Sequence, residues 1–275
     1  MLLLQNDRCL FSQSTWSILP QLLGDLLERQ RISLGMIEDV DTGELCFLGG
    51  AGFLDPVFLE KAVDQPENLV GLAFAAESRG QTVFLNTKQV AVANRAADLR
   101  LLNFLGDASK LELGVDVGIT LSAWNFFHRG FHFKEIWTIV ADPGRMGMMS
   151  GLKAPLREGS LSSRDPYWVF LFSREDALTN PSPWPNSVML AKRPILGFTR
   201  PQQRLLEMAL LDYSDRQVEI ELRLSPDAVK KRWRAIYEKV GRVEPKLLPP
   251  ATSGADRRRI LLQRLREHLE ELRPW

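Results

Sequence analysis

The chain has few cysteines, no long apolar run and almost no net charge. Its 275 residues include only Cys9 and Cys46, too few for a disulfide framework or a cysteine-rich zinc site. A membrane span needs about 18 consecutive apolar residues, and no such stretch is present. Residues 1–4 are apolar, but the chain turns polar at Gln5 and lacks the apolar core of a signal peptide. We therefore expect a cytoplasmic protein without a membrane anchor.

The near-zero net charge hides an uneven distribution. The whole chain carries 35 basic and 34 acidic residues, a formal net charge of +1. Residues 198–275 hold 17 of the basic and 12 of the acidic residues, a net charge of +5, which leaves −4 on residues 1–197. A basic segment joined to an acidic one is typical of a nucleic-acid-binding part attached to another domain.

Prolines mark the boundary between these two segments. Residues 177–194 contain four prolines, each of which lacks a backbone donor and disfavours helix in the residue before it. We therefore predict a Pro-rich linker over residues 177–197, between an N-terminal domain of residues 1–176 and a C-terminal domain of residues 198–275. A second proline-rich break precedes a last helix, predicted for residues 255–272.

The N-terminal domain mixes helical and strand patterns. A helix and an apparent hairpin, which turns at Asp41-Thr42-Gly43, are followed by further helices, the last over residues 88–105. Three strand candidates come next, at residues 118–124, 132–141 and 167–173. This order indicates an α+β domain with an antiparallel sheet, and no Gly-rich phosphate loop follows any strand. The order resembles that of PAS and GAF sensor domains, which implies sensing of a small-molecule effector or dimerisation.

Candidate ligand-binding residues cluster in one short segment of this domain. Aromatic walls with a polar contact are typical of pockets for small flat ligands, although the same side chains also suit a packed core. Gly130 and its strand-like flanks disfavour a helix with two metal-binding histidines, so we expect no metal and no cofactor. The candidate pocket residues are Trp124, Phe126, Phe127, His128, His132 and Trp137.

Capping residues predict three helices in the C-terminal domain. Thr199, Ser214 and Ser225 each precede a helical pattern, and Pro226 suits the first position of the third helix. A short helix, a tight turn and a basic helix with one apolar stripe form a helix-turn-helix, whose second helix enters the major groove of DNA. The apolar stripe of the third predicted helix consists of Val229, Trp233, Ile236 and Val240.

Residues 198–241 resemble the LuxR/NarL-type, or GerE-like, DNA-binding domain without a gap. The positions that carry the resemblance are Phe198, Thr199, Leu205, Leu206, Ser214, Val218, Leu222, Leu224, Ser225, Val229, Lys230, Ile236, Tyr237, Lys239 and Gly241. The segment departs from the family pattern at Pro201 and Gln202. Asp212 stands where a glycine is common, and Glu219 replaces a small residue.

The resemblance implies that the third predicted helix binds double-stranded DNA. Basic residues on that helix would face the groove and its phosphates, and the start of the second helix would meet phosphate through free N–H groups. The implied DNA-binding residues are Ser214, Arg216, Ser225, Lys230, Lys231, Arg232, Arg234 and Lys239. A fourth helix often carries dimerisation in this family. The corresponding leucines here, at positions 262, 265, 269 and 272, would either dimerise or pack on their own domain.

Two function hypotheses follow. The first is a sequence-specific transcriptional regulator, a homodimer that is not an enzyme and whose N-terminal domain governs DNA binding. The order of its elements does not fit the phosphorylated receiver domain that many members of the family carry. The alternative is a protein-interaction or ligand-binding module whose C-terminal helices do not bind DNA.

Overall fold

The computed structural model of the chain divides into two compact units. The first unit comprises residues 1–128 and 132–190, and the second comprises residues 129–131 and 191–275. The structure describes residues 13–39, 41–63, 69–105, 115–140, 156–157, 168–179, 188–249 and 253–275. No helix among these residues is long and apolar enough to cross a membrane.

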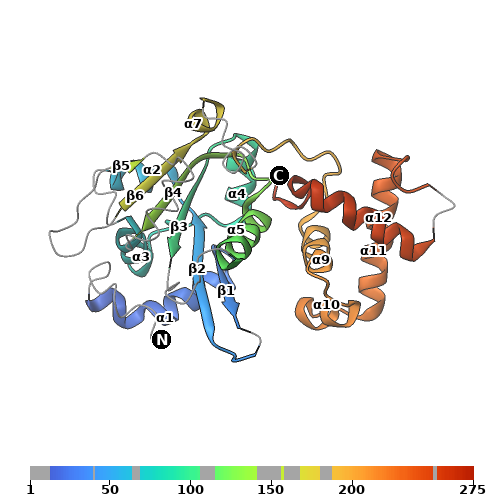
Figure 1. Cartoon of the computed structure of the whole chain (residues 1–275), viewed down its shortest axis with the longest axis horizontal. Helices are drawn as coiled ribbons and strands as arrows, with labels where there is room; N and C mark the ends of the chain where they lie inside the picture. Colours follow the sequence, from blue (N-terminus) through green and yellow to red (C-terminus); the bar gives the residue numbers. More distant parts are fainter. Residues whose placement is uncertain are drawn as a thin grey trace. The chain divides into compact units, whose positions relative to one another are not determined.

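A mixed sheet forms the centre of the first unit (Figure 1). Its strands, in spatial order, are β1 (Ile32–Glu38), β2 (Leu45–Phe53), β3 (Leu99–Leu105), β4 (Phe133–Val140), β6 (Trp168–Ser173) and β5 (Leu156–Arg157). The predicted hairpin is confirmed, because β1 and β2 pair antiparallel. The sheet was predicted to be antiparallel, and the structure confirms this only in part: β3 and β4 pair in parallel, whereas the other neighbouring strands pair antiparallel, so the sheet is mixed. The chain between these two strands crosses over through a helix, as parallel pairing requires.

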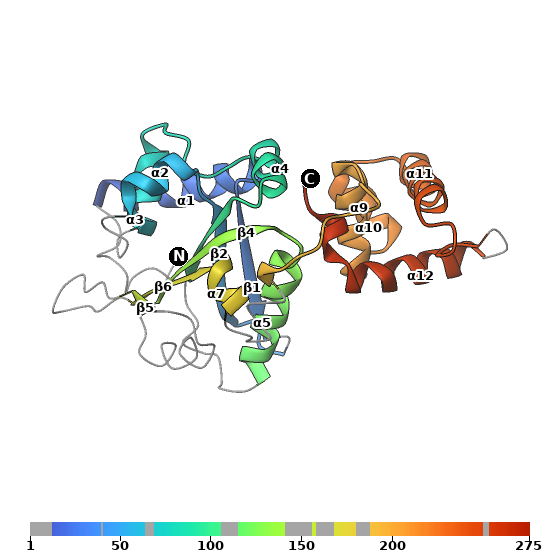
Figure 2. The ribbon, with the colours of Figure 1, turned by 90° about the horizontal axis from the view of Figure 1, so that it is seen from above.

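Helices cover both faces of this sheet (Figure 2). They are α1 (Gln13–Glu28), α2 (Pro56–Ala62), α3 (Leu69–Ser78), α4 (Thr87–Arg95), α5 (Val115–His128) and α7 (Arg174–Thr179). The first three lie on one face, where Leu69 and Phe74 of α3 belong to the same buried cluster as Leu102 of β3 and Trp137 of β4. Helix α5 lies on the opposite face (Figure 2). The first unit is therefore α+β, with its sheet buried between helices.

The structure also contradicts two predicted element boundaries in this unit. The helix predicted over residues 88–105 ends at Arg95, because Ala97 adopts a left-handed conformation (φ 54°) and the chain then enters β3. The strand predicted over residues 118–124 lies inside α5. The strands predicted over residues 132–141 and 167–173 are confirmed as β4 and β6.

The segment predicted as an extended linker is partly helical and partly buried. Residues 177–179 are the last residues of α7, which ends at Thr179, and Ala177 is buried. Val188 and Met189 are completely buried as well. The division between the two units falls between Leu190 and Ala191. The prolines therefore predicted the region in which the two units meet in the sequence, but part of that region is helical.

In the described residues of the second unit, the regular elements are all helices. These are α9 (Arg200–Leu210), α10 (Asp215–Leu222), α11 (Pro226–Val243), α12 (Gly254–Glu267) and the 3-10 helix η3 (Leu269–Leu272). The N-caps predicted for the first three are confirmed at Thr199, Ser214 and Ser225. The single helix predicted over residues 255–272 is wrong, because α12 ends at Glu267 and a 3-10 turn follows.

The leucines of this last segment pack inside the unit. Leu265, Leu269 and Leu272 are buried, and both α12 and η3 contact α9. Of the two roles left open for these leucines, the structure favours internal packing, because the segment is not one continuous helix and its leucine side chains are already covered. Residues 129–131 also belong to this unit: the Arg129 guanidinium donates to the Glu267 carbonyl at 3.0 Å, and Arg273 Nε donates to the Arg129 carbonyl at 2.8 Å.

Candidate nucleic-acid interface

Helices α10 and α11 are joined by a tight turn. Helix α10 ends at Arg223, whose left-handed backbone (φ 51°) reverses the chain, and α11 begins after the cap Ser225. Val218 of α10 is buried, as is the predicted apolar stripe of α11. Burial of this stripe fixes which face of α11 points inward, so the basic residues between its members are directed away from the core.

The predicted DNA-binding residues on α11 lie mainly on its exposed side. Lys230, Lys231 and Arg234 are exposed, whereas Arg232 is half-buried. Burial lowers the pKa of Arg232 from its usual value, and the nearby Arg204 charge lowers it further. The structure therefore places three adjacent cations on the accessible surface and a fourth partly within the wall of the unit.

Three other residues predicted to contact DNA already make hydrogen bonds within the protein. Ser214 Oγ donates to Gln217 Oε1 at 2.8 Å and accepts from the Gln217 backbone at 3.3 Å. Ser225 Oγ accepts from Ala228 N at 3.2 Å. Lys239 Nζ donates to the Gly197 carbonyl, so this ammonium holds the start of α9 in place. Arg216, by contrast, is exposed on the first turn of α10.

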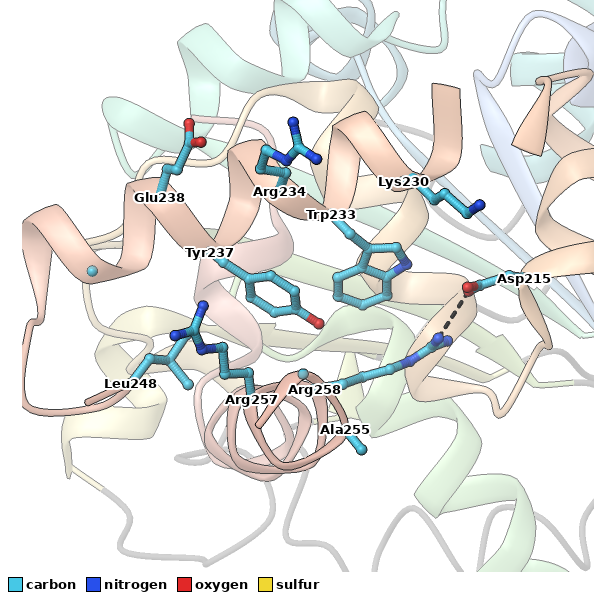
Figure 3. Close-up of a pocket in the computed structure, with 12 residues that line it drawn as sticks. Asp215, Lys230, Trp233, Arg234, Tyr237, Glu238, Leu248, Ala255, Arg257 and Arg258 are labelled. Atoms are coloured by element: carbon cyan, nitrogen blue, oxygen red, sulfur yellow. Dashed lines mark hydrogen bonds and ion pairs between the residues drawn. The ribbon is translucent and has the colours of Figure 1, made fainter. Parts of the chain in front are cut away.

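A pocket lies between α11 and α12 and has a volume of about 800 Å³. Figure 3 shows Trp233 and Tyr237 extending from α11 towards α12, from which Arg257 and Arg258 extend in turn. The lining residues are Asp215, Lys230, Trp233, Arg234, Tyr237, Glu238, Gly241, Leu248, Gly254, Ala255, Arg257 and Arg258. Four of these side chains are cationic and two are acidic, so the pocket favours an anion.

An ion pair and a cation–π contact, both made by Arg258, connect three helices at the edge of this pocket. Arg258 Nη1 of α12 lies 2.8 Å from Asp215 Oδ1 at the start of α10, the contact drawn as a dashed line in Figure 3. The same guanidinium lies 4.6 Å from the centre of the Trp233 ring, which stacks on Tyr237 with the ring centres 5.5 Å apart. Burial raises the pKa of Tyr237, so its hydroxyl stays protonated at neutral pH.

Sequence reasoning missed the contribution of α12 to this site. The run Arg257, Arg258 and Arg259 is visible in the sequence, but its position beside α11 depends on long-range packing. One feature of the sequence could have indicated this site. Three consecutive arginines lie near the start of the helix, where the positive end of the helix dipole repels them and destabilises the helix.

The aromatic and histidine residues proposed as a ligand pocket in the first unit lie on α5, on strand β4 and on the connection between them. Trp124 and His128 stack on α5 with ring centres 4.5 Å apart, and Trp124 Nε1 donates to Asn103 Oδ1 at 3.2 Å. Phe127, in contrast, is 47% exposed. Trp137 lies in the core cluster on β4, which includes none of the other five candidates.

The two histidines among these candidate residues are buried and make hydrogen-bond contacts with neighbouring residues. His128 Nδ1 lies 2.9 Å from the Trp124 carbonyl, and the backbone N–H of His132 donates to Asn94 Oδ1 at 2.7 Å. Both histidines are buried. The packing alternative for these residues therefore has direct structural support. Phe126 contacts its neighbour Phe127 edge-on, with ring centres 5.4 Å apart.

Comparison with known proteins gives no independent assignment. No protein-family model, no curated protein and no solved structure matches the chain. Within the described residues, no group of three or more His, Cys, Asp and Glu side chains is arranged to hold a metal ion. The geometry of α10, α11 and α12 is therefore the basis on which a function can be proposed.

Proposed function

We propose that the chain is a transcriptional regulator whose C-terminal unit binds double-stranded DNA through α11, in the manner of the LuxR/NarL-type domains that it resembles. The observation that carries the proposal is the exposed basic face of α11. Lys230, Lys231 and Arg234 project from a helix whose opposite face is buried, and a capped partner helix precedes it across a tight turn. A rigid basic helix of this kind fits the major groove.

The charge of the unit supports the same function. A protein that neutralises several phosphates releases condensed counterions, so its affinity for DNA falls steeply with salt. If about five phosphates are neutralised per chain, log K should fall against log salt with a slope near −4 to −5. In this proposal the N-terminal unit senses a small molecule or mediates dimerisation, and it thereby governs binding.

The proposal is tested by selecting fragments bound by the full chain from genomic DNA and measuring their affinity. The double variant Lys230→Glu, Arg234→Glu should lose at least about 100-fold in affinity, because two phosphate-facing cations become repulsive. The control is Arg242→Glu, Lys246→Glu, which makes the same change of charge at two exposed positions outside the predicted interface. Equal affinities for the parent chain and the first variant, or no enrichment of any fragment, would rule out the proposal.

A further inference from the structure

The pocket between α11 and α12 joins the proposed DNA-binding face to a second basic helix. Lys230 and Arg234 line it from α11, while Arg257 and Arg258 line it from α12. Cations from two helices therefore line the pocket. Asp215 already pairs with Arg258, so one of the two carboxylates in the lining is neutralised within the pocket wall.

The first turn of α12 adds backbone donors to this cationic lining. Gly254 and Ala255 lie at the pocket, directly after the N-cap Ser253, whose hydroxyl accepts from Asp256 N. The first N–H groups of a helix lack partners within the helix, and with the helix dipole they favour an anion. The backbone and side chains of α12 thus point to the same ligand chemistry.

Trp233 provides a separate indication of a missing acceptor. The residue is 7% exposed and lines the pocket, and within the described part of the chain its indole Nε1 has no hydrogen-bond partner. Buried polar groups in folded proteins are nearly always hydrogen-bonded, and an exception calls for an explanation such as a ligand. This N–H group has almost no accessible surface, so a ligand oxygen that reaches it must displace part of the pocket wall.

We propose that the α11–α12 pocket binds a backbone phosphate of the DNA duplex whose groove α11 enters. The inference rests on the proposed function and extends its interface from α11 to the N-terminal half of α12. The phosphate is held by Arg257 and the first turn of α12, while the ion pair with Asp215 fixes the position of the Arg258 side chain at the pocket wall. Helix α12 therefore contributes directly to DNA affinity.

Ala255 offers a test that spares the fold. It is exposed and lies in the first turn of α12, where an acidic residue is favourable for the helix. In the full chain, Ala255→Glu should weaken binding to a fluorescein-labelled duplex of mixed sequence by about three- to tenfold. The slope of log K against log salt should become shallower by about 0.9, the contribution of one phosphate. Ala255→Lys should tighten binding and steepen the slope.

Gln263 on the same helix provides the matched control. It is exposed and outside the pocket, so Gln263→Glu makes the same change of net charge without altering the lining. If Ala255→Glu and Gln263→Glu have equal effects, the pocket is not a phosphate site, although the proposed function still stands if Lys230→Glu, Arg234→Glu abolishes binding. If the parent chain does not bind the duplex, the proposed function fails and this inference fails with it.

Discussion

Glu271 is a carboxylate held in the interior of the second unit. It is 3% exposed, and its two oxygens accept hydrogen bonds from the backbone N–H groups of Ile195 and Leu196, each at 2.8 Å. These two bonds favour the ionised form, but burial opposes it more strongly and raises the pKa of Glu271 above its usual 4.5. The neighbouring Glu270 charge acts in the same direction as burial. One side chain thus fastens the segment before α9 to the end of the chain, at an electrostatic cost that depends on pH.

Stability should therefore fall as pH rises through the titration of Glu271. Since its pKa is raised on folding, the native state binds more protons than the unfolded state between about 4.5 and the raised value. The contribution of Glu271 is complete below that window and is lost above it. We expect the free energy of unfolding of the parent chain, minus that of Glu271→Gln, to decrease with increasing pH in urea titrations. An increase would mean that the two backbone hydrogen bonds outweigh burial.

Helix starts in the second unit were predictable because caps are local. A serine or threonine accepts hydrogen bonds from residues two or three positions ahead, so Ser214 and Ser225 could be identified without knowing the fold. The apolar stripe of α11 is likewise periodic within one helix. The exposed basic face of the candidate site followed from these two local features.

The elements that were wrongly predicted depend on packing instead. Helix α5 and strand β3 are both rich in apolar residues, and short apolar runs do not distinguish a buried helix from a buried strand. The break between α4 and β3 occurs at Ala97, a residue with no preference for the left-handed conformation that it adopts. The α11–α12 pocket could not be predicted for a related reason, since the sequence does not reveal which face of α12 meets α11.

Asp212 marks the end of α9 in a conformation that glycine adopts more easily. Its φ of 60° lies in the left-handed region, which glycine adopts without side-chain strain. Asp212→Gly should raise the free energy of unfolding of the second unit by about 0.5 kcal/mol, because relief of strain exceeds the added backbone entropy. Its only described ion pair, with Arg266 at 3.8 Å, is highly exposed and contributes little.

The matched variant Asp212→Ala should have the opposite effect. Alanine keeps the side-chain strain but loses the polar group that lets aspartate tolerate this conformation, so we expect a loss of about 1 kcal/mol. Denaturant titration of the full chain, followed through the transition of the second unit, measures both values. Identical stabilities for the two variants would show that backbone conformation at Asp212 does not limit the unit.

The division into compact units sharpens the charge asymmetry of the chain. The second unit gains Arg129, Lys192 and Arg193 relative to residues 198–275, so its net charge rises to +8, and the first unit is left with −7. The total of +1 is thus the near-cancellation of two large opposite charges. Charges on the first unit repel DNA phosphates over about a Debye length, roughly 10 Å at 0.1 M salt. If the second unit binds DNA as proposed, the acidic charge of the first unit should weaken its non-specific binding.

Removing acidic charge from the first unit should strengthen non-specific binding, provided that the chain binds DNA as proposed. The quadruple variant replaces four exposed glutamates with glutamine: Glu28, Glu38, Glu60 and Glu175. Its affinity for duplex DNA of mixed sequence should rise about two- to fivefold at low salt and converge with that of the parent chain as salt screens the repulsion. Lys61→Gln, Lys88→Gln, which removes exposed positive charge from the same unit, should shift affinity in the opposite direction. A gain that persists at high salt would identify a local contact instead of long-range repulsion, because only the long-range effect is screened.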